Sequence, residues 1–188
     1  MPPENPDLIN RIPATGSAER VRKYFNSQKF DAGYQIDPQI KETIVTLNTL
    51  GFPTSYSCEG WNPKHPYWRA GRDRMDQGAA EMPYISLGDN PGEFDPELLE
   101  ITFGKIPAPE IAARIKDSRA KLRQLLEMSG AGNISVREST LYKESWYLQG
   151  TGGPPSVTTA TALSPEKLHA DQLKAIHDFT AFLNAKYL

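Results

Sequence analysis

Three residues, Gly51, Phe52 and Pro53, constrain the fold of this chain more than any other feature, because they must end one helix and begin a different structure. Glycine tolerates the left-handed conformation that follows many helices, and the next residue can then fold back on the last turn, as in a Schellman motif. Proline cannot continue a helix. The sequence therefore predicts a sharp stop, with Gly51 just past the helix end.

The helix before this stop has clear signals at its start and along its buried face. Asp37 can accept hydrogen bonds from the first turn, and Pro38 suits the first helical position because its missing N–H costs nothing there. Ile40, Ile44 and Leu47 follow at spacings that put them on one face. We therefore predict a helix over residues 38–50.

After the stop, residues 54–58 alternate in the manner of a short strand. Thr54, Tyr56 and Cys58 fall on one side, with serines between them, and Glu59-Gly60 ends the run. A side chain at such a strand-to-turn junction is held by the sheet and faces the loop that follows, which is a common place for a functional site.

The remaining patterns predict a single α+β domain, ordered as helix, β-hairpin, helix, β-strands and helix, with a mainly antiparallel sheet. Residues 1–17 are expected to form a flexible arm, 18–188 the domain, and 60–82 a lid-like loop. Further helices are predicted over 17–30, 110–128 and 164–187, and further strands over 83–87, 134–137, 145–148 and 158–163. The 83–87 strand is expected to pair antiparallel with 54–58. Leu99, Ile101 and Phe103 alternate as in a strand, although Asp95-Pro96 could instead open a short helix.

Composition excludes several classes of protein. A chain of 188 residues suits one domain, and 21 basic against 23 acidic residues leave no global positive field for nucleic acid. One cysteine excludes an internal disulfide and multi-cysteine metal sites. No apolar run approaches the roughly 20 residues that span a membrane, and the polar start does not resemble a signal peptide. We expect a cytoplasmic protein without membrane contact, and take a monomer as the starting expectation.

Residues 60–82 combine aromatic and cationic side chains. Trp61, Tyr67 and Trp68 accompany a set of cations, which are Lys64, Arg69, Arg72 and Arg74. Arginines and exposed rings suit phosphates and bases, through forked hydrogen bonds and stacking, so an anionic small molecule or RNA is the expected partner. The alternative is that these arginines pair with the acidic stretch 89–100 and only clasp the structure together.

Cys58, Glu59 and His65 are the candidate reactive residues. Cys58 could act as a nucleophile with Glu59 or His65 as its proton partner, because a thiolate needs a nearby base. The alternative is that Cys58 is a small core residue and His65 a surface histidine. His169 and His177 stand two helical turns apart, which does not suit a helical metal pair, so no metal is expected. No motif identifies a cofactor.

The segment over residues 37–87 resembles a pattern found in small uncharacterised bacterial and phage proteins. The matching residues are Leu50-Gly51-Phe52 with Thr54, then Ser57-Cys58 with Gly60, then Pro83-Tyr84-Ile85. The pattern is distantly similar to the Ser-Cys-Ser-Gly segment of the third protein of wybutosine tRNA modification, a methyltransferase-associated family. The resemblance implies that Ser57, Cys58 and Gly60 line a pocket. Glu59 stands where that family has its second serine, and Trp61 where it has a basic residue.

Two functions are consistent with these patterns. The first is an enzyme or binding protein for a nucleotide or a nucleic-acid-derived ligand, with Cys58, Glu59 and His65 as the reactive candidates. Ligand contacts would come from the neighbouring residues, which are Ser57, Gly60, Trp61, Trp68, Arg69, Arg72 and Arg74. The second is a non-catalytic protein, such as a mobile-element accessory, that binds a protein partner through the aromatic residues of 60–82.

Overall fold

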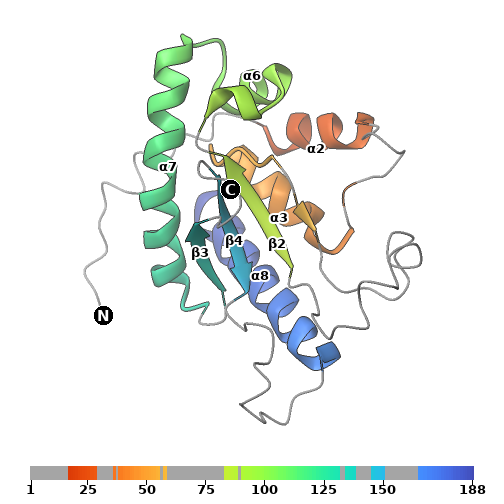
Figure 1. Cartoon of the computed structure of the whole chain (residues 1–188). Helices are drawn as coiled ribbons and strands as arrows, with labels where there is room; N and C mark the ends of the chain where they lie inside the picture. The colour runs from red at the N-terminus through yellow and green to blue at the C-terminus, as the bar shows by residue number, and fades with distance from the viewer. Residues whose placement is uncertain are drawn as a thin grey trace, which may run out of the picture.

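The computed structural model of the chain describes residues 17–28, 36, 38–55, 57–58, 83–88, 90–131, 134–138, 145–150 and 165–188. Its helices are α2 (Ala18–Ser27), α3 (Pro38–Thr49), α6 (Pro96–Phe103), α7 (Ala108–Ser129) and α8 (Pro165–Tyr187), with a short 3-10 helix, η1 (Pro91–Glu93). Its strands are β1 (Ser57–Cys58), β2 (Tyr84–Gly88), β3 (Ile134–Glu138) and β4 (Ser145–Gly150). The fold is α+β, as expected (Figure 1).

The strands lie in one sheet in the order β1-β2-β4-β3, so β1 and β3 are its two edges among the described strands. β1 pairs antiparallel with β2, with Ser57 opposite Ile85, which confirms the pairing expected from the sequence. β3 and β4 form the expected hairpin, and β4 also pairs with β2. The predicted strand over 158–163 lies outside the described residues.

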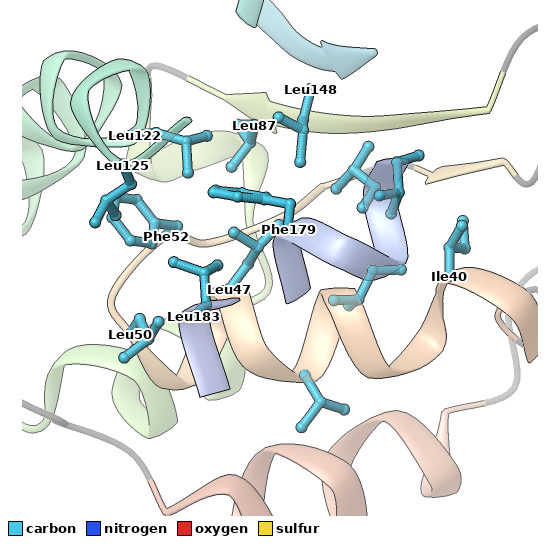
Figure 2. Packing of buried hydrophobic residues seen from close by; sticks show 14 of the residues in the cluster. Ile40, Leu47, Leu50, Phe52, Leu87, Leu122, Leu125, Leu148, Phe179 and Leu183 are labelled. Carbon is cyan, nitrogen blue, oxygen red and sulfur yellow. The ribbon is translucent and has the colours of Figure 1, made fainter. Parts of the chain in front are cut away.

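Helices α3 and α8 lie behind the sheet in Figure 1, and the core fills the space between them and the strands. Figure 2 shows Phe179 of α8 between the strand residues Leu87 and Leu148 on one side and Leu47 of α3 on the other. All four side chains are at most 1% exposed. The inner face of the sheet is therefore covered by a continuous apolar layer.

Polar side chains fix α3 against α8. The Thr43 and Thr180 hydroxyls lie 2.7 Å apart, and the Thr46 hydroxyl donates to Asn184 Oδ1 at 2.8 Å. His177 Nε2 lies 2.6 Å from the Gln39 carbonyl oxygen near the start of α3. In these three contacts the residue numbers increase together along both helices, so α3 and α8 run in the same direction where they touch.

The stop after α3 has the predicted geometry. Gly51 has φ of 85°, its N–H donates to the Asn48 carbonyl at 3.2 Å, and the Phe52 N–H donates to the Leu47 carbonyl at 2.9 Å. These are the two hydrogen bonds of a Schellman motif. Phe52 is 1% exposed and joins the same core as Leu47. The expected cap Asp37 lies outside the described residues.

Gly51→Ala is expected to lower the free energy of unfolding by about 1 kcal/mol, because a Cβ is penalised at positive φ. The Cβ itself has room, with Phe103 Cε1 the nearest atom at 3.7 Å, so the loss would measure backbone conformation alone. Gly51→Asn should cost less, since asparagine tolerates this conformation. Chemical denaturation measures all three proteins, and an alanine variant as stable as wild type would contradict the assignment.

Three sequence predictions are wrong in detail. The strand predicted over 54–58 is shorter in the structure, because β1 comprises only Ser57–Cys58 and Thr54 and Ser55 precede it. Residues 99–103 belong to helix α6 rather than to a strand, and the alternative start holds: Asp95 Oδ1 accepts from the Glu97 N–H at 2.8 Å with Pro96 in the first turn. The first helix ends at Ser27 instead of near Phe30, because Gln28 is already extended. Its predicted cap is confirmed, since the Ser17 hydroxyl accepts from the Arg20 N–H at 3.1 Å.

The two long helices match their predictions closely. α7 begins at Ala108 and ends before Gly130, which has φ of 67° in the left-handed region. α8 begins at Pro165, and its Leu173, Ile176 and Leu183 are buried. None of the helices described is both long enough and apolar enough to cross a membrane.

Candidate functional site

The candidate site lies where the chain leaves strand β1, and the approach to that strand is firmly held. Asn48, completely buried on α3, donates from Nδ2 to the Thr54 hydroxyl at 2.9 Å and accepts at Oδ1 from the Thr54 N–H at 3.3 Å. The same Nδ2 donates to the Ile44 carbonyl at 2.8 Å. One amide side chain therefore ties the end of α3 to the segment that leads into β1.

A second set of hydrogen bonds attaches this segment to the sheet. The Ser55 N–H donates to the Ser86 carbonyl at 3.0 Å, and the two serine hydroxyls lie 3.1 Å apart. Ser86 is 2% exposed, so this contact is shielded from water. The start of β1 is thus held from the helix side by Asn48 and from the sheet side by Ser86.

The register of β1 and β2 brings both ends of the segment 59–82 to one corner of the sheet. Cys58 lies directly opposite Tyr84, and Tyr84 in turn lies opposite Gln149 of β4. Directly opposite residues in an antiparallel pair have Cα atoms about 4.5–5.5 Å apart. The described chain therefore stops at Cys58 of β1 and resumes at Pro83, which is buried and directly precedes Tyr84 of β2.

The two faces of the sheet at this corner differ. Ile85 is fully buried in the core under β2, and side chains alternate along a strand, so its neighbours Tyr84 and Ser86 belong to the opposite face. Tyr84 is half-buried. At the corner that flanks 59–82, Tyr84 therefore belongs to the face of the sheet turned away from α3 and α8.

Only part of the predicted site falls within the described structure. Ser57 and Cys58 form β1, and the backbone register above places them. The other predicted site residues lie outside the described residues, and they are Glu59, Gly60, Trp61, His65, Trp68, Arg69, Arg72 and Arg74. Their assignment stays a prediction.

Residues 89–100 form the acidic stretch that could instead pair with the arginines of 60–82, and several of them contact nearby helices. Glu93 Oε1 accepts from the Asn90 N–H at 3.2 Å in a capping box that opens η1. Asp95 caps α6 and its Oδ2 accepts from the Tyr24 hydroxyl at 2.9 Å, while Glu100 lies 3.6 Å from Lys105. Several carboxylates of 89–100 are therefore used in holding helices.

Two side-chain contacts of helix α2 shift pKa values. Burial, and then the hydrogen bond to Asp95, raise the pKa of Tyr24 well above its ordinary value. On the surface, the Arg22 guanidinium hydrogen-bonds Glu42 at 2.8 and 3.3 Å and lowers the pKa of that carboxyl. Both contacts join α2 to its neighbours and stabilise structure.

The residues that sequence analysis missed are the polar groups that hold the corner, chiefly Asn48, Thr54 and Ser86. An asparagine near the end of a helix is a weak helix former, and Asn48 sits within the run 43–50, all of it buried. That combination is the one signal that could have marked it. No cluster of three metal-ligating side chains occurs within the described ranges.

Comparison with known proteins adds no relative: no protein-family model, no curated protein and no solved structure matches this chain.

Proposed function

We propose that the protein binds a phosphate-bearing ligand, a nucleotide or a short RNA, at the corner of the sheet where β1 ends and β2 begins. One observation carries the proposal: the Cys58–Tyr84 register brings the described residues on either side of the segment 59–82 together at one corner of the sheet. A segment rich in cations and aromatic rings is thereby tethered beside the strand that carries the cysteine.

The chemistry of that segment suits phosphate and base together. Arg69, Arg72 and Arg74 can each offer a forked pair of donors to phosphate oxygens, and such charged hydrogen bonds contribute roughly 1.5–3 kcal/mol each before ordering costs. Trp61 and Trp68 supply flat surfaces on which a base can stack. Ser57 and Gly60 would complete the ligand contacts at the strand end.

The reactive groups of the proposal are Cys58, Glu59 and His65. Cys58 is the last described residue of β1, and its backbone lies opposite Tyr84 of β2, so its chain position adjoins the segment that carries the arginines. Neighbouring arginines would favour its thiolate, which is the nucleophilic form. The proposal treats the protein as cytoplasmic.

The test is a binding titration that follows tryptophan fluorescence, with GTP, ATP and an oligouridylate as probes at low and moderate salt. We expect binding that weakens with salt, since phosphate contacts release counterions. Substituting Arg69, Arg72 and Arg74 together by glutamine should weaken binding by about 100-fold, on the order of 1 kcal/mol for each lost charged contact. Comparison of nucleotides with RNA identifies which source of phosphate is preferred.

The matched control removes the same charge elsewhere. Lys105, Lys116 and Lys121 lie on or beside α7, away from the β1 corner, and their triple glutamine variant should bind within twofold of wild type. Bound ligand should also slow the reaction of Cys58 with a thiol reagent. Binding that the two triple variants lose equally, or a thiol that reacts only after denaturation, would contradict the proposal. An absence of binding to every probe would favour the protein-interaction alternative.

A further inference from the structure

A groove lies at the opposite edge of the sheet from β1, between the last turns of α7 and strand β3. Its volume is about 450 Å³. Arg123, Leu126 and Glu127 line it from the helix, and Ile134, Ser135 and Val136 line it from the strand. The strand order separates this groove from the proposed ligand corner by the whole width of the sheet.

The strand that forms one wall of the groove is an edge strand. In the described sheet β3 pairs with β4 on one side, and no described strand pairs with its other side. An edge strand presents unpaired N–H and C=O groups, which makes it a template for another strand. A strand added there would lie over the outer flank of α7, with the groove as its floor.

The groove floor is apolar and already packed. Leu126 and Ile134 are 8% and 5% exposed, and Ala131 and Val136 are partly buried against the same core. Side chains from an added strand would therefore extend the existing core and would not need a new one.

Two opposite charges of α7 stand on the rim of the groove. Arg123 and Glu127 stand one turn apart on α7, both are exposed, and neither side chain has an ion pair or hydrogen bond in the described part of the chain. By contrast, Arg114 on the same helix reaches Glu110 at 2.8 Å. Within the described ranges, one cation and one carboxylate thus have no side-chain partner beside the outer edge of β3.

These two charges complement each other across a two-fold axis. In a symmetric dimer, residue i of one copy meets residue j of the other, and j meets i in return. Antiparallel α7 helices related by an axis midway between the two positions would set Arg123 against the partner subunit's Glu127, and Glu127 against the partner subunit's Arg123. The same axis would run β3 antiparallel to its copy.

We propose that β3 and the adjoining flank of α7 form the interface of a homodimer, in which the two sheets join edge to edge through β3. A second copy of the chain accounts for three observations in the described structure: the outer edge of β3, the apolar groove beside it, and the exposed, unpaired Arg123 and Glu127. It replaces the starting expectation of a monomer, and it is independent of the ligand site at the β1 corner.

The experiment is sedimentation velocity of the full chain over a wide range of concentrations, with charge-reversed variants. The wild-type protein should show a reversible dimer. Arg123→Glu sets two like-charge contacts across the axis and should raise the dimer dissociation constant by about 100-fold, as Glu127→Arg should. Both side chains are exposed, so circular dichroism should show that both variants fold, while their melting temperatures should lose the concentration dependence expected of a dimer. Arg114→Glu, on the same helix and outside the groove, should leave the dimer intact.

Mixing the two charge-reversed variants gives the decisive test. Each single reversal should be largely monomeric, whereas an equimolar mixture of Arg123→Glu and Glu127→Arg proteins should form a heterodimer, because both cross-axis contacts are then attractive. A wild-type protein that stays monomeric at every concentration would overturn the proposal. A dimer that is indifferent to both reversals, or a mixture that stays monomeric, would overturn it as well.

Discussion

Phe179→Ala is expected to lower the free energy of unfolding by about 3–5 kcal/mol, one of the two largest effects that the structure predicts. Phe179 is fully buried and lies where helix α8, helix α3 and the inner face of the sheet meet (Figure 2). Its ring contacts the layer that includes Leu47, Leu87 and Leu148. Removing it opens a cavity that these residues can fill only by moving secondary-structure elements, so the full cost of cavity formation should appear.

Urea denaturation followed by circular dichroism measures this loss, and Phe182 offers a control on the same helix. The Phe182 ring lies 6.5 Å from the Phe179 ring and is only partly buried, so Phe182→Ala should cost about half as much or less. Phe179→Leu preserves most of the volume and should cost about 1–2 kcal/mol. Equal losses for Phe179→Ala and Phe182→Ala would show that Phe179 is not the centre of the core.

The helices that could be predicted from the sequence are those with strong local end signals. Ser17, Gly51 and Gly130 mark helix ends because their preference is set by the backbone within a few residues, and each acts as expected in the structure. The same holds for Pro165 at the start of α8. Such signals need no knowledge of the rest of the fold.

The sequence of helix α6 suggests a strand because the helix is buried on several sides, and its apolar residues therefore do not follow the 3.6-residue helical period. Leu98, Leu99, Ile101, Thr102 and Phe103 are all buried, so apolar residues occur on nearly every side of this short helix. A short apolar run of this kind is compatible with strand or helix by periodicity alone. The end signal, Asp95 followed by Pro96, was the better guide.

The candidate site could be predicted only in its location along the chain. The antiparallel pairing of 54–58 with 83–87 follows from two matched runs of strand residues, and the register confirms it for Ser57 and Cys58, the part of the run that forms β1. The contacts that hold β1 in place are different, because they join Asn48 to Thr54 and Ser55 to Ser86 through side chains whose burial depends on the whole fold. The edge position of β3 depends likewise on β4 inserting beside β2, which no local pattern determines.

Asn48→Ala is expected to lower the free energy of unfolding by about 2–4 kcal/mol, because it removes three hydrogen bonds inside the protein. The Thr54 N–H would lose its acceptor while Thr54 stays buried at 6% exposure, and an orphaned buried donor costs about 1–3 kcal/mol by itself. Asn26, which is exposed on α2, provides the control: Asn26→Ala should change stability by about 0.5 kcal/mol or less.

Asn48→Asp tests the direction of these bonds as well as their presence. An ionised carboxylate can accept from the Thr54 N–H but cannot donate to the Ile44 carbonyl, 2.8 Å from the present amide nitrogen, whereas the protonated acid can. Burial and that carbonyl should therefore raise the pKa of the introduced carboxyl in the folded state. A raised folded-state pKa favours folding below the unfolded pKa and is lost as pH rises, so the variant should lie closest to wild-type stability near about pH 4 and fall furthest below it near about pH 8. Urea midpoints at both pH values, each relative to wild type at that pH, measure the difference. If the variant lost equal stability at both, the introduced carboxyl would have no raised folded-state pKa, and donation from the residue 48 side chain to the Ile44 carbonyl would not contribute to stability.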